Sequence, residues 1–103
     1  MKSKRTKALE IPKQVKEKVY MRDSYRCVLC ARYVSVENAC CHFIARSQGG
    51  LGIEENILTL CNECHRKFDN SEHRQELKRY FRDYLKSKYK NWSEKELYYK
   101  KYE

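Results

Sequence analysis

The chain has 103 residues and a formal net charge of +9, from 23 Lys and Arg against 14 Asp and Glu. A chain of this length forms one domain with a modest core and is too short for two. No apolar run approaches the length of a membrane span, and the basic N-terminus is not followed by the apolar segment of a secretory signal. We therefore expect a soluble, cytoplasmic protein with no membrane partner.

The basic charge favours a polyanionic partner. Lys and Arg are spread through both terminal parts of the chain, and nine tyrosines lie among them. Such a composition is typical of nucleic-acid binding, although the same charge can simply keep a small protein in solution. An acidic membrane surface is disfavoured because no basic helix has a strongly hydrophobic opposite face.

The first part of the chain is predicted to contain an arm and a helix. Residues 1–8 are basic and have no apolar periodicity, which indicates a mobile arm along a phosphate backbone, or a frayed end without a role. From Pro12, the spacing of Val15 and Val19 predicts a short amphipathic helix to about Arg22.

The middle of the chain is predicted to contain two short strands. Residues 39–44 and 57–60 are short apolar runs, and we expect them to pair antiparallel across a loop. Residues 31–37 favour a further short extended piece. The loop holds three glycines, which we expect to supply positive φ angles: Gly49, Gly50 and Gly52.

Helices are predicted for the rest of the chain. One begins at Asn62 or Glu63, and a second follows a capping signal at Asn70 and Ser71. The apolar stripe of the second helix predicts that one face packs on the core, through Leu77, Tyr80, Phe81, Tyr84 and Leu85.

A last short helix is predicted near the C-terminus. Asn91 and Trp92 interrupt the preceding helical pattern, and Ser93 with Glu96 has the spacing of a capping box. We expect this helix to extend through Tyr98 and Tyr99.

Two pairs of cysteines have the spacing of metal-binding knuckles. Cys27 and Cys30, and then Cys61 and Cys64, are each separated by two residues, so that a tight turn presents both sulfurs to one ion. Four thiolates around a tetrahedral Zn²⁺ form a closed structural site with no position for water. We predict structural zinc here, in preference to four unrelated buried thiols or to redox pairs.

Four further residues have the order expected of a phosphodiester-cleaving site. His42 follows an apolar run and can act as a general base. His65 and Asp69 are four residues apart, so one helix face can present both to a divalent ion. Asn56 can hold the loop of His42 by hydrogen bonds or complete the metal shell. The structural alternatives are a core histidine, a turn asparagine, a helix-capping aspartate and an extra zinc ligand at His65.

With these residues, the sequence resembles the HNH endonucleases, also called ββα-metal or His-Me finger nucleases, and especially small phage and prophage members. The resemblance covers roughly residues 12–70 and rests on the four cysteines, the run from His42 to Gly50, Asn56, and the run from Leu60 to His65 with Asp69. It implies that His42 is the general base and that His65 binds a catalytic Mg²⁺-type ion. It also implies that Asn56 is the central asparagine of the motif and that the four cysteines hold structural zinc. Asp69 falls where many members place another metal-binding histidine.

Cys41 departs from the family pattern. The residue before the base is usually His or Asp and helps to bind the catalytic metal, whereas a thiolate is a poor ligand for Mg²⁺ and favours softer ions. Either the ion is held by His65, Asp69, water and the substrate phosphate, or the metal preference is unusual, or the activity is weakened. We expect Mg²⁺, Mn²⁺ or Ni²⁺ as the catalytic ion, with Cys41 as a doubtful ligand.

The sequence thus predicts an α+β fold, with a ββα-metal (HNH) core, a four-cysteine zinc knuckle, an N-terminal helix and a C-terminal helical extension. The expected segments are a basic arm at 1–11, a nuclease domain at 12–70 and the extension at 71–103. We expect metal-dependent nicking of double-stranded DNA, with DNA contacts from Arg46, Arg66 and Lys67. The alternative is a zinc-stabilised DNA-binding module, or an accessory module of packaging or recombination.

Cutting both strands would require a dimer or two visits by a monomer. A partner in phage or host DNA processing is a further expectation, and a phage-encoded protein of this kind would act in the cytoplasm of a bacterial host.

Overall fold

A computed structural model of the chain describes residues 3–35, 40–70 and 72–100. Its helices are α1 (Lys4–Leu9), α2 (Lys13–Arg22), α3 (Asn62–Asn70) and α4 (Arg74–Lys88), with short 3₁₀ helices η1 (Arg46–Gln48), η2 (Glu54–Asn56) and η3 (Glu94–Leu97). The strands β1 (Cys41–His42) and β2 (Ile57–Leu58) pair antiparallel, with Cys41 opposite Leu58 and His42 opposite Ile57. Helices around a small sheet confirm the predicted α+β class.

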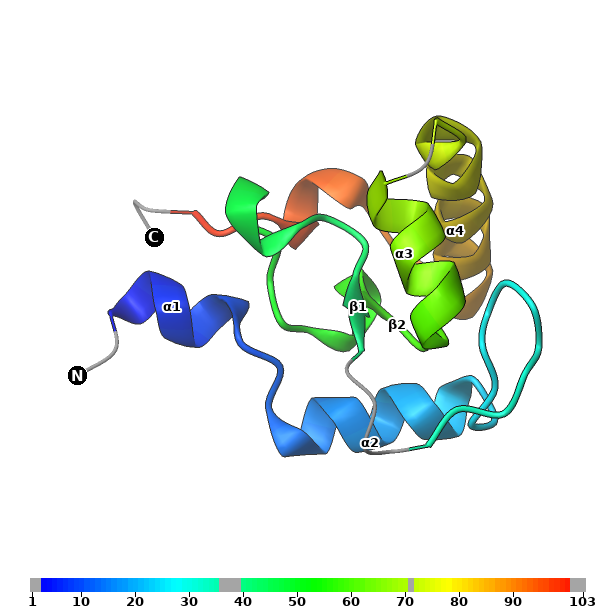
Figure 1. The fold of residues 1–103 in the computed structure, drawn as a ribbon. Coiled ribbons are helices and arrows are strands. Elements are labelled where there is room, and N and C mark those ends of the chain that lie inside the picture. Colours follow the sequence, from blue (N-terminus) through cyan, green and yellow to red (C-terminus); the bar gives the residue numbers. More distant parts are fainter. Residues whose placement is uncertain (1–2, 36–39, 71, 101–103) are drawn as a thin grey trace.

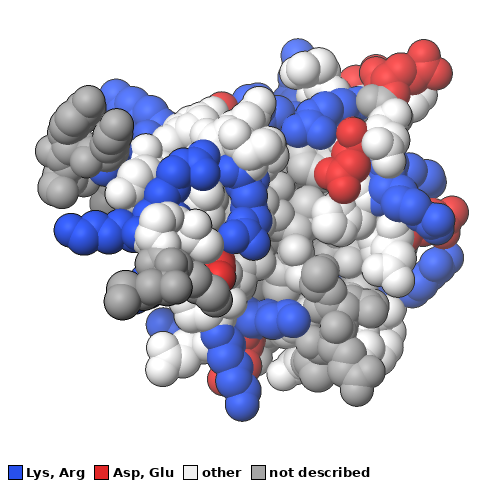
Figure 2. All heavy atoms as spheres, turned by 60° about the vertical axis from the view of Figure 1, so that its left-hand side comes forward, with Lys and Arg blue, Asp and Glu red and all other residues white. Residues whose placement is uncertain are grey.

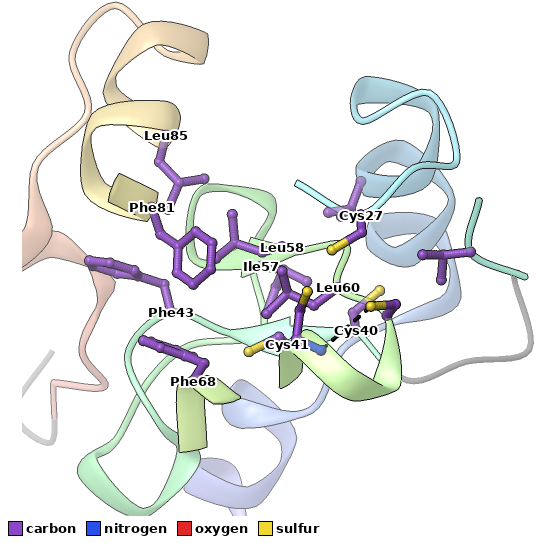
Figure 3. Close-up of a cluster of buried hydrophobic side chains, with 14 of the residues drawn as sticks. Cys27, Cys40, Cys41, Phe43, Ile57, Leu58, Leu60, Phe68, Phe81 and Leu85 are labelled. Carbon is purple, nitrogen blue, oxygen red and sulfur yellow. Dashed lines mark hydrogen bonds between the residues drawn. The ribbon is translucent and has the colours of Figure 1, made fainter. Parts of the chain in front are cut away.

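The hairpin of β1 and β2 lies between α2 on one side and the α3–α4 pair on the other (Figure 1). Phe68 of α3 and Phe81 of α4 meet edge to face, with ring centroids 5.0 Å apart. Figure 3 shows both rings gathered with Leu85 of α4 around the buried side chains of Ile57 and Leu58. The core is therefore centred where α3 and α4 cover β2. In the described ranges, no helix has both the length and the apolar character to cross a membrane.

Helix α2 has the predicted position and ends in a buried ion pair. Arg22 donates through Nε and Nη2 to the two carboxylate oxygens of Asp23, at 2.7 and 2.8 Å, and to the carbonyl of Ile57 at 2.7 Å. Asp23 also accepts the backbone N–H of Thr59, at 3.1 Å, and the hydroxyl of Tyr84. This pair ties α2 to the strand β2 and to α4.

Both strands are shorter than the predicted runs 39–44 and 57–60, although residue 39 lies outside the described ranges. Beyond β2, Thr59 pairs with other segments, because its N–H donates to the Asp23 carboxylate and its carbonyl accepts the N–H of Val28. Beyond β1, the backbone N–H of Ile44 donates to the side chain of Asn56 instead of to a strand. At the end of each strand, a side-chain oxygen thus accepts the backbone N–H that would otherwise bond to the opposite strand. Of the predicted extended piece at 31–37, residues 36 and 37 lie outside the described ranges, and the described part has an isolated bridge between Arg26 and Tyr33.

The glycines of the loop have two different roles, which corrects the prediction that all three supply positive φ. Only Gly49 has a positive φ, of 84°. A Cβ at Gly50 would lie 1.7 Å from the carbonyl oxygen of Ile44, and one at Gly52 would lie 1.7 Å from that of Glu10. Gly50 and Gly52 are therefore required for close backbone approach rather than for a left-handed conformation.

The predicted aperiodic arm contains a helix. Helix α1 begins after Ser3, whose hydroxyl accepts the N–H of Thr6 at 3.1 Å and so caps the first turn. Leu9 at the end of α1 is 3% exposed and belongs to the buried residues. Six residues without an apolar repeat gave no periodic signal, so the Ser3 cap was the available sign of this helix.

Helix α4 is present as predicted, but Tyr80 of its predicted core face is 48% exposed, and the predicted capping signals also need correction. Helix α4 begins at Arg74, after His73, and Ser71 of the predicted cap lies outside the described residues. Ser93 is the N-cap residue of η3, as predicted, but its side chain makes no cap hydrogen bond, so the capping box does not form, and η3 ends at Leu97. The chain then returns to the glycine loop, where Tyr99 N–H donates to the Gly49 carbonyl at 2.7 Å. This pairing prevents a helix through Tyr99.

Candidate metal centre and adjoining cleft

A cleft of about 580 Å³ brings together four of the predicted site residues. It lies between the end of α1, the start of α2, strand β1 and helix α3, and it adjoins η1. Its lining consists of Glu10, Ile11, Lys16, Cys40, His42, Ala45, Arg46, His65 and Asp69. Predicted residues that are 27 positions apart in the chain, from His42 to Asp69, therefore face one space.

His42 is held in one tautomer by the end of α1. Its Nε2 lies 2.8 Å from the carbonyl oxygen of Leu9. Because a carbonyl can only accept, Nε2 carries the proton and Nδ1 keeps the lone pair of a neutral imidazole. Nδ1 is therefore the ring atom that can take up a proton.

The surroundings of His42 favour its neutral form. Burial lowers the pKa of His42, and the positive charge of Arg46 and the nearby His65 lower it further, against the hydrogen bond to Leu9, which raises it. The pKa lies below the ordinary value for histidine, so the ring is neutral at neutral pH. A neutral ring with one free lone pair has the protonation state of a general base.

His65 and Asp69 lie one turn apart on α3, as their spacing predicts. The Nε2 atom of His65 is 3.4 Å from Oδ2 of Asp69, and the two side chains are 32% and 54% exposed. An imidazole nitrogen and a carboxylate oxygen at this separation can both reach one divalent ion. Among the described residues, no third Cys, His, Asp or Glu places a ligand atom close enough to form a group of three with this pair.

The sequence left two roles open for Asn56, a hydrogen bond to the loop or a place in the metal shell, and the structure shows the hydrogen bonds. It is fully buried, and its Oδ1 accepts the N–H of Ile44 at 2.7 Å. Its Nδ2 donates to the carbonyls of Leu51 at 2.8 Å and Ile44 at 3.3 Å. Asn56 thus fixes both ends of the glycine loop, and it does not line the cleft.

Of the two neighbouring cysteines, Cys40 lines the cleft and Cys41 is in the core. Cys41 is 2% exposed, its Sγ contacts the carbonyl of His42 at 3.5 Å, and Figure 3 shows it among the buried side chains. Burial, with the negative charge of Asp69 as a smaller cause, raises the pKa of the Cys41 thiol. A protonated thiol is a poor metal ligand. Cys41 therefore has the character of a core residue.

The four remaining cysteines form a cluster that fits a metal ion. The sulfurs of Cys27, Cys30, Cys61 and Cys64 all lie within 4.8 Å of one another, and Cys30 Sγ is 3.7 Å from Cys61 Sγ. Four sulfurs ~2.3 Å from a tetrahedral Zn²⁺ are themselves about 3.8 Å apart. In each pair, the backbone N–H of the second cysteine donates to the sulfur of the first, at 3.5 Å. The prediction that these four cysteines come together to form a possible metal site is therefore confirmed.

The predicted DNA contacts lie on different surfaces. Arg46 lines the cleft, whereas Arg66 and Lys67 are exposed on another face of α3, beside Glu63 and Asn70. Figure 2 shows Lys and Arg side chains spread widely over the face that carries α1, with fewer Asp and Glu between them. Of the three predicted contacts, only Arg46 therefore lines the cleft.

The contributors to the cleft that sequence reasoning missed include the Leu9 carbonyl, Glu10 and Lys16. Every residue has a main-chain carbonyl, so no sequence motif can indicate that the carbonyl of Leu9 contacts His42. Glu10 offered a weak signal, since it is the first acidic residue of an otherwise basic N-terminus.

No family model and no solved structure matches the chain. A protein of Nostoc sp. (strain PCC 7120 / SAG 25.82 / UTEX 2576) named Anaredoxin is 33% identical to it over 60 residues. The aligned residues make up 58% of this chain and 78% of the relative.

Proposed function

The chain belongs to the same protein family as Anaredoxin, and we propose that it acts as a metal-dependent endonuclease that hydrolyses phosphodiester bonds of DNA. The observation that carries the proposal is the arrangement of His42, which lines one cleft with the His65–Asp69 pair while its Nε2 is bonded to the Leu9 carbonyl, so that Nδ1 keeps its lone pair. The succession β1, glycine loop, β2 and α3 is consistent with a ββα-metal core of the HNH type. We assign the nuclease site to this unit.

In the proposed reaction, His42 acts as the general base. Its Nδ1 takes a proton from a water molecule, whose oxygen attacks the phosphorus of the scissile phosphate while the bond from phosphorus to the 3′-oxygen breaks. The imidazolium that forms is stabilised by the Leu9 carbonyl, which accepts the hydrogen bond from Nε2. The lone pair of Nδ1 can thus accept the proton, and the Leu9 carbonyl bonded to Nε2 can stabilise the positive charge that results.

His65 and Asp69 would hold the catalytic ion. A divalent cation such as Mg²⁺, Mn²⁺ or Ni²⁺ at this place supplies Lewis-acid stabilisation of the phosphate and of the departing oxygen. Arg46 at the edge of the cleft adds a permanent positive charge for the substrate backbone. We assign the four-cysteine cluster to structural zinc, which would link the turn after α2 to the start of α3.

Double-stranded DNA is the proposed substrate, on the basis of the +9 charge and the basic surface beside α1. With one His42 site per chain, a monomer would nick one strand. A second cut requires a dimer, a second visit or a partner in DNA processing, and the proposed place of action is the cytoplasm.

The test is relaxation of supercoiled plasmid by the purified protein in Mg²⁺, Mn²⁺, Ni²⁺ or Zn²⁺. We expect nicking by the parent and its loss in His42→Ala, by about 10²-fold or more, the usual effect of removing a general base. His73→Ala is the matched control, because His73 is an exposed histidine outside the cleft. Equal activity of His42→Ala and the parent would contradict the proposal.

The alternative within DNA biology is a zinc-stabilised binding or accessory module. It predicts that the parent and His42→Ala bind DNA equally and that neither cuts it under any ion. An accessory role in packaging or recombination would be indicated by strong cutting only when a partner enzyme is added.

A second candidate is a redox centre with iron in the four-cysteine cluster. It is favoured by the name of the relative, Anaredoxin, and by the donor set, because a tetrahedral group of four thiolates suits iron as well as zinc. Metal analysis of protein produced with equal zinc and iron, followed by visible absorption spectroscopy, separates the two ions. Iron with a reversible change of absorption on reduction would support the redox candidate, and colourless zinc protein would remove it.

A further inference from the structure

The last turn of α1 makes two contacts with the parts of the chain that form the cleft. The carbonyl of Ala8 accepts the N–H of Gly52 at 2.9 Å, and the carbonyl of Leu9 accepts Nε2 of His42 at 2.8 Å. Carbonyls at a helix end have no partner within the helix. In α1 these open positions are filled by the glycine loop and by the histidine that we assign as general base.

Helix α1 depends on these contacts for its position. It has six residues, and helices of this length are not stable alone in water. Its anchor is Leu9, which is 3% exposed. The placement of the Leu9 carbonyl against His42 therefore follows from the docking of α1 on the core.

Gly52 is the residue that permits the docking. A Cβ on Gly52 would meet the carbonyl oxygen of Glu10 at 1.7 Å and the backbone nitrogen of Ile11 at 3.1 Å. Both are backbone atoms, which cannot rotate away as a flexible side chain can. Any larger residue at position 52 must push residues 10 and 11 outward, and Leu9 is their direct neighbour.

We propose that α1 is a positioning element of the cleft, in which the Leu9 carbonyl keeps the proton of His42 on Nε2 and Gly52 permits the contact. The proposal rests on the role assigned to His42 and places residues before the predicted 12–70 nuclease domain in its site. Without the carbonyl, the proton of the neutral ring would distribute between Nδ1 and Nε2. The molecules protonated on Nδ1 would then lack the lone pair with which we propose that His42 takes up a proton.

The experiment measures the tautomer directly. Full-length protein labelled with ¹⁵N in its histidines is examined by long-range ¹H–¹⁵N correlation at a pH where His42 is neutral, and His42→Ala identifies the signals. Gly52→Ala is compared with Gly49→Ala, three residues earlier, which strains the loop at a φ of 84° but leaves the new Cβ 3.8 Å from the backbone nitrogen of Tyr99. Gly49→Ala therefore controls for loop strain that does not press on residues 10 and 11. Leu9→Ala is compared with Leu97→Ala, the same truncation of another buried leucine.

We expect the Nε2-protonated form in the parent and in both controls, and a mixture of tautomers in Gly52→Ala and Leu9→Ala. Nicking should fall about 10- to 100-fold in these two variants, as for loss of other orienting contacts, and by less in each matched control. An Nε2-protonated His42 in a folded Gly52→Ala or Leu9→Ala protein would overturn the proposal, and so would an Nδ1-protonated parent. If Gly52→Ala does not fold, the Leu9 comparison decides.

The tautomer measurement is independent of catalysis. A parent that cuts no DNA under any ion refutes the proposed nuclease, while the difference between Gly52→Ala and Gly49→Ala still supports the positioning by α1. The reverse result, with active parent and unchanged tautomers, refutes the positioning alone.

Discussion

The side chain of Asn56 pairs with both backbone groups of Ile44, accepting from its N–H at 2.7 Å and donating to its carbonyl at 3.3 Å. The same amide donates to the carbonyl of Leu51 at 2.8 Å. One buried side chain therefore closes the glycine loop between residues 44 and 51. The chain immediately before Ile44 contains His42, so this closure also fixes the place of the histidine.

Replacing Asn56 is expected to destabilise the fold. Asn56→Ala leaves the buried Ile44 N–H and the partly buried Leu51 carbonyl without these partners, at a cost of about 3 kcal/mol, since each such group costs roughly 1–3 kcal/mol. The free energy of unfolding in urea measures this change. Asn91→Ala, at an exposed asparagine, should change it little, and an equal effect of both substitutions would contradict the role of Asn56.

Nicking should depend on pH through His42. Because burial and the charge of Arg46 lower the pKa of His42, the base stays unprotonated to a pH below the ordinary histidine value of about 6.5. The acid limb of the pH–rate profile should have its midpoint below that value. In Arg46→Gln the charge that lowers the pKa is removed, so the limb should move to higher pH; a move to lower pH would show that another group controls it.

Stability should also depend on His42. The folded state disfavours the protonated ring, so the unfolded chain binds this proton more readily and the stabilising contribution is complete above about pH 6.5. It is lost as the pH falls from there towards the lowered pKa of the folded state. Urea unfolding across this interval should show a smaller acid-induced loss in His42→Gln than in the parent, whereas identical slopes would count against the lowered pKa.

The four-cysteine cluster should bind one metal ion that the fold requires. Cys61→Ser removes a buried sulfur of the cluster and should abolish stoichiometric metal, with a large fall in melting temperature, because binding energy at such sites is folding energy. Cys40→Ser is the matched control, since Cys40 is buried outside the cluster. Metal analysis and thermal unfolding give the comparison, and full metal content in Cys61→Ser would refute the site.

Breaking the ion pair of Arg22 and Asp23 should be costly. Asp23→Ala leaves a buried guanidinium without its carboxylate and the Thr59 N–H without its acceptor, at about 3–5 kcal/mol. The exposed pair of Lys18 and Glu54 is the control, because Lys18→Ala removes a charge that is 69% exposed and should have little effect. Urea unfolding of both variants measures the difference, and similar losses would contradict the tie between α2 and α4.

DNA affinity should respond more to the cleft than to the outer face of α3. Arg46→Ala should weaken binding and reduce the slope of log affinity against log salt by about 1, the effect of one lost phosphate contact. Arg66→Ala and Lys67→Ala remove charges of the same sign outside the cleft and should change the slope less. Anisotropy of a labelled duplex without divalent ions measures all three, and the opposite order would place the DNA on the outer face of α3.

The spacing of residues in the sequence was sufficient to predict the features that depend only on residues close together in the chain. A two-residue gap brings two sulfurs together in each knuckle, and a four-residue gap puts His65 and Asp69 on the same side of α3. The periodicity of valines likewise placed α2 correctly, from Lys13 to Arg22. These are short-range consequences of backbone geometry, so they can be read before the fold is known.

The tertiary structure alone decided what depends on groups far apart in the chain. The partner of His42 is 33 residues away and is a main-chain carbonyl, which no residue type announces. Asn56 holds the loop because its side-chain oxygen accepts the N–H of Ile44, 12 residues away. Cys41 belongs to the core because its side chain is 2% exposed. The sequence by itself determined which chemical groups are present and which close neighbours share a face. Packing decided which of those groups face the cleft, because hydrogen-bond partners and burial are set by segments that meet only in the folded chain.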